Sequence, residues 1–158
     1  MNVEEILWPG NETDLEDKLF STSHLRVVTI ESFPFVYVVA VPPSGNCSEL
    51  DHVDSDGYPH THMECEGPSP RHKGRHHCCK GYCMDLLKEL SGRIKFSFSL
   101  RLVEDGKYGS LNKVNGSHDR CWNGMVGEVV HGKADLIMAS LTINSERSNY
   151  IDYSKPYR

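Results

Sequence analysis

The sequence has 158 residues, of which 38% are hydrophobic, and this is enough for one modest domain with a buried core. Its formal net charge of −5 argues against a nucleic-acid-binding protein, because such proteins carry a basic surface stripe. No apolar run approaches the roughly 20 residues of a membrane span. Residues 1–5 (MNVEE) also lack the basic start and the apolar stretch of a signal peptide.

The first half of the chain predicts few regular elements. Residues 1–23 are acidic and irregular and are expected to be a linker. Residues 25–30 (LRVVTI) are rich in β-branched side chains and predict a buried strand, and residues 35–41 resume an extended pattern after Pro34. Residues 42–77 are expected to form one long loop, which a compact domain tolerates when cross-links tie both of its ends.

A helix and a strand follow this loop. The apolar residues of 81–90 recur at i, i+4 and i+8, which predicts an amphipathic helix, and Gly92 is expected to stop it. Residues 96–103 alternate between apolar and polar side chains and predict a strand with one more polar face. Residues 105–109 (DGKYG) predict a turn after that strand, with Tyr108 held within it.

The last quarter of the chain continues the alternation. Residues 122–130 predict a second amphipathic helix, residues 134–139 predict a third strand, and residues 151–153 predict a last strand after a short polar helix. The order is therefore strand, loop, helix, strand, helix, strand, helix, strand. Such an order predicts an α/β fold with an open sheet of mainly parallel strands.

In sheets of this kind, ligands bind beyond the carboxyl ends of the strands. The segments 31–34, 105–110 and 140–147 follow strands and are expected to cluster there. Thr142 offers a hydroxyl and an N–H group, and the short helix after it adds further N–H groups and a positive dipole end. Arg147 adds a planar fork that suits a carboxylate. A helix cap beside a surface arginine would have the same pattern, but the convergence of three segments favours a site for the α-carboxylate of an amino acid.

Cysteines and glycosylation sequons together indicate an oxidising, extracellular compartment. The cysteines are Cys47, Cys65, Cys78, Cys79, Cys83 and Cys121, and the sequon asparagines are Asn11, Asn46 and Asn115. Since a secreted protein needs a targeting signal, the chain is expected to be a piece of a longer secreted or membrane-anchored protein.

The adjacent cysteines Cys78 and Cys79 are each expected to bond a different partner, because a disulfide between neighbours is strained. Cys47 and Cys65 are the obvious candidates. Two such bridges would tether a loop at residues 42–79 to the start of the following helix.

The other two cysteines have different expected fates. Cys83 lies on the apolar face of the predicted helix 81–90 and is expected to be a buried thiol. Cys121 has three open fates, namely a bond to Cys83, a free thiol, or a bond to another chain.

Histidines gather in the long loop, so zinc has to be considered. The six are His52, His60, His62, His72, His76 and His77. No C-x-x-C spacing occurs, and adjacent cysteines ligate one metal poorly, so a polar exposed loop is favoured and no metal site is assigned. A weak surface metal site stays as an alternative. No nucleophile–base or phosphate-binding motif occurs, so neither an enzyme nor a cofactor is predicted.

Several specific motifs occur in one order along the chain. They are residues 24–30 (HLRVVTI), 34–38 (PFVYV), 78–87 (CCKGYCMDLL), 105–109 (DGKYG), 122–128 (WNGMVGE), 140–147 (SLTINSER) and 154–157 (SKPY). In this order they resemble the first half of the ligand-binding domain of NMDA-type ionotropic glutamate receptor subunits. Residues 8–10 (WPG) fit the linker before that domain, and the resemblance covers most of the chain outside residues 44–77.

The resemblance implies a clamshell like that of periplasmic solute-binding proteins. Residues 24–158 would be its first segment, mainly lobe 1, with an open sheet and flanking helices, and incomplete without a second segment. Agonist would bind between the lobes, and closure would open a cation channel. Arg147 is implied to hold the agonist α-carboxylate, Thr142 and the backbone at Ser140 to hold its carboxylate and amino groups, and Tyr108 to pack over it as an aromatic wall.

The resemblance also implies the disulfides Cys47–Cys78 and Cys65–Cys79. It implies a hetero-tetramer with other receptor subunits on the extracellular face of the postsynaptic plasma membrane. Membrane contact would come only through segments absent from this chain.

Two subunit types of the family share these motifs. Residues 105–109 and 133–135 resemble the obligatory subunit, whose agonists are glycine and D-serine, although that subunit usually has proline where Ser140 stands. Residues 140–142 resemble the glutamate-binding subunits, but those carry histidine where Tyr108 stands. The glycine type is therefore favoured. A glutamate-binding subunit, a secreted solute-binding module and a secreted His/Cys metal-binding module remain as alternatives.

Overall fold

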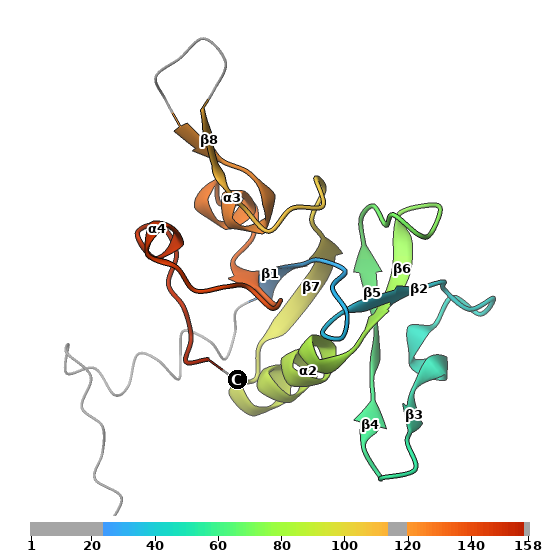
Figure 1. Cartoon of the computed structure of the whole chain (residues 1–158). Helices are drawn as coiled ribbons and strands as arrows, with labels where there is room; N and C mark the ends of the chain where they lie inside the picture. The colour runs from blue at the N-terminus through green and yellow to red at the C-terminus, as the bar shows by residue number, and fades with distance from the viewer. Residues whose placement is uncertain (1–23, 114–119, 157–158) are drawn as a thin grey trace, which may run out of the picture.

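The computed structural model describes residues 24–113 and 120–156 and gives a mixed α/β fold built on a curled open sheet (Figure 1). The predicted linker at residues 1–23 and the sequon asparagines Asn11 and Asn115 lie outside these residues. This architecture fits one lobe of the periplasmic-binding-protein type.

The main sheet has six strands in the order β10-β1-β7-β5-β6-β2. They are β1 (His24–Thr29), β2 (Tyr37–Val39), β5 (His62–Glu66), β6 (His76–Lys80), β7 (Ser97–Leu102) and β10 (Leu136–Ile137). The pairs β10–β1, β1–β7 and β7–β5 are parallel, whereas β5–β6 and β6–β2 are antiparallel. The expectation of mainly parallel strands therefore holds only for the β10-β1-β7-β5 part of the sheet.

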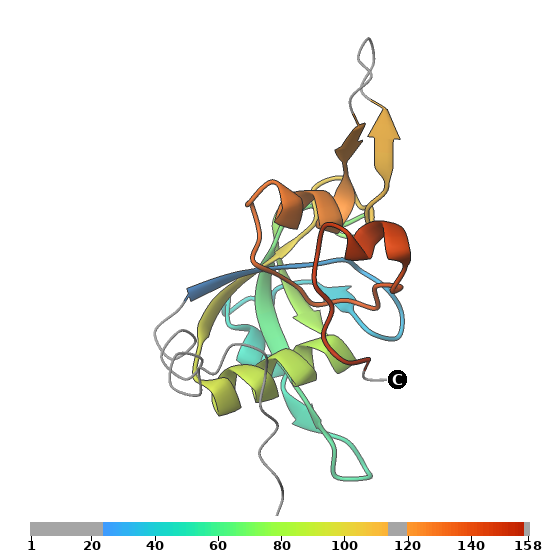
Figure 2. The same cartoon turned by 90° about the vertical axis from the view of Figure 1, so that its left-hand side faces the viewer.

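Strand β1 shows how the sequence builds layers on both faces of the sheet. Val27 and Val28 are both fully buried, although neighbouring side chains of a strand point to opposite faces. Val27 packs in the core beneath helix α2 (Tyr82–Ile94), and Val28 packs in the core beneath helix α3 (Gly124–Val130). A strand covered on both faces has the continuous apolar run seen here. Figure 2 shows α2 and α3 on the two sides of the sheet.

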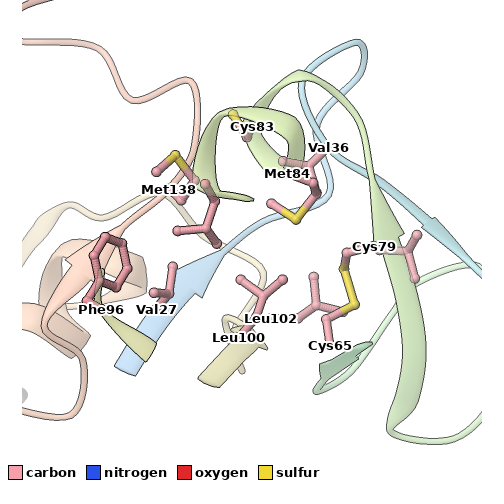
Figure 3. Packing of buried hydrophobic residues seen from close by; sticks show 12 residues of the cluster. Val27, Val36, Cys65, Cys79, Cys83, Met84, Phe96, Leu100, Leu102 and Met138 are labelled. Atoms are coloured by element: carbon pink, nitrogen blue, oxygen red, sulfur yellow. A yellow bond between two sulfur atoms is a disulfide. The ribbon is translucent and has the colours of Figure 1, made fainter. Parts of the chain in front are cut away.

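The larger core lies between α2 and the sheet (Figure 3). Its buried members are Val27, Val36, Val38, Cys65, Cys79, Cys83, Met84, Leu87, Phe96, Leu100, Leu102 and Met138. Burying each large apolar side chain contributes about 1.5–3 kcal/mol, so this cluster is the main source of the stability of the fold.

Helix α2 is longer than its sequence predicts. It runs past Gly92 to Ile94, and Lys95 then ends it in the left-handed conformation with φ of 60°. The predicted stop at Gly92 is therefore wrong, because a lysine takes the conformation for which glycine is usually chosen. Tyr82 belongs to the apolar face predicted for residues 81–90, but it is 48% exposed. No described helix has the length and apolar character needed to cross a membrane.

The prediction of one long loop at residues 42–77 is wrong, because the segment contains regular elements. The segment contains a short 3-10 helix, strands β3, β4 and β5, and the first two residues of β6. The 3-10 helix is η1 (Cys47–Leu50), and the two short strands after it are β3 (His52–Val53) and β4 (Pro59–His60). Strands β5 (HMECE) and β6 (HHCCK) lack the β-branched runs that identify strands, because buried cysteines form much of their inward faces.

The C-terminal third also departs from expectation. Residues 151–153 form no strand, and the strand predicted at 134–139 shortens to β10 at the edge of the sheet. Helix α3 begins at Gly124 rather than at residue 122. A hairpin of β8 (Leu111–Lys113) and β9 (Arg120–Trp122), which was not predicted, projects from the α3 side (Figure 1).

Candidate ligand-binding site

Three segments that follow neighbouring parallel strands meet at one edge of the sheet. They are residues 31–36 after β1, 104–110 after β7 and 139–147 after β10. The backbone N–H of Val103 donates to the carbonyl of Thr29 at 2.9 Å. The buried hydroxyl of Thr29 donates to the carbonyl of Met138 at 2.7 Å. These bonds join the three strand ends into one platform, as the sequence predicted.

Residues 104–110, called the aromatic loop below, are fastened to the start of α3. The N–H of Met125 donates to the carbonyl of Lys107 at 3.0 Å, and the N–H of Val126 donates to that of Tyr108 at 3.2 Å. The first N–H groups of α3 are thus occupied by the protein itself. These bonds hold the backbone of Tyr108, and its ring packs against the core on the α3 side.

Two glycines allow this close approach. Gly124 has φ of +63°, and a Cβ there would lie 2.5 Å from the backbone of Gly109 and of Lys107. A Cβ on Gly109, which has φ of +131°, would lie 2.6 Å from the side chain of Val126. Both the left-handed conformation and the lack of space therefore require glycine at these positions.

Arg147 joins the aromatic loop to the last segment. It lies in α4 (Ser145–Ser148), a four-residue helix whose Asn144 cap accepts the N–H of Arg147 at 2.8 Å. Its Nη1 donates to the carbonyl of Thr142 at 3.0 Å, and its Nη2 donates to that of Gly109 at 2.9 Å. So short and already capped a helix adds little dipole, and the guanidinium is the main positive group here.

No acidic side chain in the described part of the chain balances the charge of Arg147. No carboxylate lies within ion-pair distance of it in residues 24–113 and 120–156. Arg26 offers the contrast, because its fork binds both oxygens of Asp135 and lowers the pKa of that carboxyl to about 2. A half-buried guanidinium without an acidic partner is suited to an external carboxylate.

Thr142 and Ser140 present polar groups beside this guanidinium. The hydroxyl and N–H of Thr142, and the N–H and carbonyl of Ser140, make no hydrogen bond within the described residues. The Thr142 carbonyl is different, since it accepts from Arg147 and also from the Tyr153 hydroxyl at 3.2 Å. Free N–H and O–H donors suit a carboxylate, and a free carbonyl suits an ammonium group.

Ser32 belongs to the same cluster and lies in the segment 31–34, which was expected to converge there, although no role was predicted for Ser32 itself. The Tyr108 hydroxyl donates to Ser32 Oγ at 2.7 Å, and Ser32 Oγ lies 3.5 Å from Ser140 Oγ. The predicted residues Arg147, Thr142, Ser140 and Tyr108 are therefore connected through Ser32 and the aromatic loop. The only sequence feature that could have pointed to Ser32 is its position just after the first strand, because residues that follow parallel strands gather at the site.

A groove of about 670 Å³ lies next to this cluster but does not coincide with it. Ser140 and Thr142 contribute to its lining, whereas Tyr108 and Arg147 do not. Most of its wall is apolar and comes from α2, β10 and residues 150–156. Tyr108 and Arg147 therefore lie outside the groove, and Thr142 on its wall is exposed, so a ligand held by these groups would need a further surface to cover it.

Two buried disulfides join η1 and β5 to β6, the strand that directly precedes α2. They are Cys47–Cys78 and Cys65–Cys79. Cys83 is buried outside both bridges, as predicted, and Cys121 is an exposed thiol with its sulfur 3.3 Å from His131 Nε2. The structure thus contradicts a bond between Cys83 and Cys121, which was one of three fates considered.

The disulfides also bear on the metal-binding alternative, because the cysteines nearest the histidines are not thiolates. The rings of His52 and His60 stack at 4.9 Å. His52 Nδ1 lies 3.2 Å from the carbonyl of Leu50, and His60 Nε2 lies 3.2 Å from Asp54. Among the described residues, no three His, Cys, Asp or Glu side chains are arranged to hold a metal ion.

The sequon asparagine Asn46 is exposed and stands directly before η1. Its side-chain oxygen accepts the N–H of Ser48 at 3.0 Å, while the intervening Cys47 is buried in its disulfide. A glycan on Asn46 therefore remains a prediction that the exposure of the side chain permits.

We expect His62 to make the protein less stable at acidic pH. Its side chain is 4% exposed, and this burial lowers the pKa of the imidazole, although Asp51 at 3.4 Å opposes the shift. The unfolded chain, with a pKa near 6.5, then binds the proton more readily than the folded chain. The contribution of His62 to the free energy of unfolding should therefore be constant above about pH 6.5 and decrease below it.

Thermal midpoints measured between roughly pH 7.5 and pH 5.5 check this expectation. The wild-type midpoint should fall more steeply with acidification than that of His62→Gln. His76→Gln, at an exposed histidine of the neighbouring strand, is the control and should keep the wild-type slope. Identical slopes for the wild type and His62→Gln would show that His62 is not responsible.

Comparison with known proteins adds a family relationship to this geometry. Residues 50–158 match the family model described as the ligated ion channel L-glutamate- and glycine-binding site. The whole chain is 38% identical to Glutamate [NMDA] receptor subunit 1 of Drosophila ananassae, 37% to that of Drosophila melanogaster and 36% to that of Drosophila persimilis. The chain spans about 15% of the length of each of these relatives.

Proposed function

The chain belongs to the ionotropic glutamate receptor family, as part of an NMDA-type ligand-binding domain, and on this premise we propose that it supplies the agonist-binding face of lobe 1 of a two-lobed clamshell. Its relatives are receptor subunits and not enzymes. The agonist is an amino acid, held at the edge of the sheet where Arg147, Thr142, Ser140 and Tyr108 converge.

The unbalanced charge of Arg147 is the observation that carries this proposal. The guanidinium is half-buried, and its two recorded side-chain bonds go to the carbonyls of Thr142 and Gly109. Because a guanidinium has five N–H groups, three remain for the α-carboxylate of an agonist. The N–H and hydroxyl of Thr142 add donors to the same carboxylate, and the carbonyl of Ser140 accepts from the ammonium group.

The open position of these groups supports a second lobe. A site exposed on one surface leaves its charged ligand in water, where each ion pair contributes little. Closing another lobe over the ligand removes that water and strengthens the contacts. In the whole receptor, this closure would pull open a cation channel assembled from several subunits. The domain would face the extracellular side of a postsynaptic plasma membrane.

Among agonists, we propose glycine or D-serine. The aromatic wall at Tyr108 and the similarity to subunit 1 proteins support a glycine-type subunit. A glutamate-binding subunit is the second candidate, and Ser140 favours it, since the glycine type usually has proline there.

A concentration–response comparison on the full-length receptor separates the two candidates. The receptor is expressed with a partner subunit of the other type, and Tyr108→Ala is introduced into this chain alone. Loss of the wall should raise the glycine concentration needed for half-maximal current and leave that of glutamate unchanged. A shift in glutamate alone would assign the chain to the glutamate type, and no shift in either would contradict a binding role for Tyr108.

A further inference from the structure

Three hydroxyl groups from three different segments form one chain of contacts at the site. The Tyr108 hydroxyl donates to Ser32 Oγ at 2.7 Å, and Ser32 Oγ lies 3.5 Å from Ser140 Oγ. Tyr108 follows β7, Ser32 follows β1 and Ser140 follows β10. Ser32 is the middle member, and it connects the aromatic wall to the segment that presents Thr142.

Ser32 is a fixed point for these contacts. Its N–H donates to the carbonyl of Val36 at 2.9 Å, and its carbonyl accepts the N–H of Val36 at 2.8 Å and that of Phe35 at 2.8 Å. Val36 is fully buried in the core beneath α2. The backbone of Ser32 therefore has little freedom, and a short serine side chain adds only one heavy-atom torsion.

The ring of Tyr108 needs such a fixed point. The backbone carbonyl of Tyr108 accepts a hydrogen bond from the N–H of Val126, and the side chain packs against the core on the α3 side. Tyr108 nevertheless remains only half-buried. A half-buried aromatic side chain can still rotate about its χ angles unless its outer end is held. The hydrogen bond to Ser32 is the recorded contact of that outer end.

We propose that Ser32 is a positioning residue for agonist binding, which acts by holding the Tyr108 ring over the ligand and by linking that ring to Ser140. This inference rests on the proposed function. Ser32 itself need not touch the agonist. Its effect on affinity passes through Tyr108, so removing either end of their hydrogen bond should have the same consequence.

The two contacts of Ser32 are unequal in strength. A separation of 2.7 Å is typical of a good O–H···O hydrogen bond, whereas 3.5 Å is at the limit. The Tyr108–Ser32 bond should therefore account for most of the effect, and the Ser32–Ser140 contact for a smaller part. Ser140→Ala is accordingly expected to weaken binding less than Ser32→Ala does.

A double-mutant cycle on the full-length receptor tests this inference. Equilibrium binding of radiolabelled glycine, and in parallel of radiolabelled glutamate, is measured on membranes that carry the wild type, Ser32→Ala, Tyr108→Phe or the double variant. Each single variant should weaken binding of one of the two probes about three- to tenfold, as loss of one hydrogen bond predicts. The double variant should bind as weakly as the weaker single variant, because both changes break the same bond.

Controls separate positioning from general damage. Ser32→Thr keeps the hydroxyl and should bind within about twofold of the wild type. Ser55→Ala changes an exposed serine between β3 and β4, outside the segments that form the site, and should have no effect. Surface labelling confirms that each variant reaches the membrane.

The outcomes also distinguish this inference from the proposed function. Single effects that multiply in the double variant, or no effect of Ser32→Ala, would overturn the positioning role of Ser32. If the positioning role of Ser32 fails but Arg147→Lys removes binding in the same assay, the proposed function stands without that role. If Arg147→Lys binds normally, the proposed function fails and this inference fails with it.

Discussion

Replacing Arg147 with lysine is expected to abolish the agonist response of the full-length receptor and to leave its surface expression intact. Lysine keeps the positive charge but loses the planar fork that binds both oxygens of a carboxylate. It also cannot hold the Thr142 and Gly109 carbonyls together as the guanidinium does. Disrupting a hydrogen-bonded charge pair typically costs about 2–5 kcal/mol, which weakens binding by roughly 30-fold to several thousandfold, so the response should be lost at agonist concentrations that half-saturate the wild type.

Agonist concentration–response curves measure this effect, and Arg120→Lys is its matched control. Arg120 is exposed in β9, outside the site, and its replacement should leave the curve unchanged. A normal response of Arg147→Lys would contradict the carboxylate role of Arg147.

Removing the Cys65–Cys79 disulfide is expected to destabilise the fold substantially. Both residues are buried in the core beneath α2, where their sulfurs pack beside Leu102 (Figure 3). The bridge closes a segment with a sequence separation of 14 and joins β5 to β6. Losing a native disulfide of this kind costs about 2–5 kcal/mol, mainly because the unfolded chain regains freedom.

The double variant Cys65→Ala/Cys79→Ala is therefore expected to unfold at a thermal midpoint several degrees lower than that of the wild type. Cys121→Ala, at the exposed thiol outside both bridges, is the control and should keep the wild-type midpoint. An unchanged midpoint in the double variant would mean that the strand pairing of β5 and β6 stabilises this region without the bridge.

The elements that the sequence predicted well are those with clear apolar periodicity. They are strands β1 and β7 and helices α2 and α3. The apolar residues that each of them buries recur in the sequence with the spacing typical of a strand or a helix. Strands β5 and β6 were missed for a physical reason. Their inward residues include Cys65, Cys78 and Cys79, whose sulfurs become ordinary core atoms only when the disulfides form.

The site was predictable to the extent that topology gathers strand ends. Parallel neighbours bring their carboxyl ends together, so Tyr108 and the segment from Ser140 to Arg147 were expected to meet. Ser32 was not predictable in the same way. Its partner Tyr108 is 76 residues away, and a serine in a turn gives no sign of which distant hydroxyl it will accept.

A calorimetric titration tests the central claim most directly. Residues 24–158 are joined through a short flexible linker to the second segment of the ligand-binding domain from the same gene, and glycine, D-serine and glutamate are added in separate experiments. Our account predicts saturable heat of binding for glycine and D-serine and none for glutamate. Absence of binding heat for all three amino acids, from a folded protein, would contradict the assignment of this chain as an agonist-binding segment.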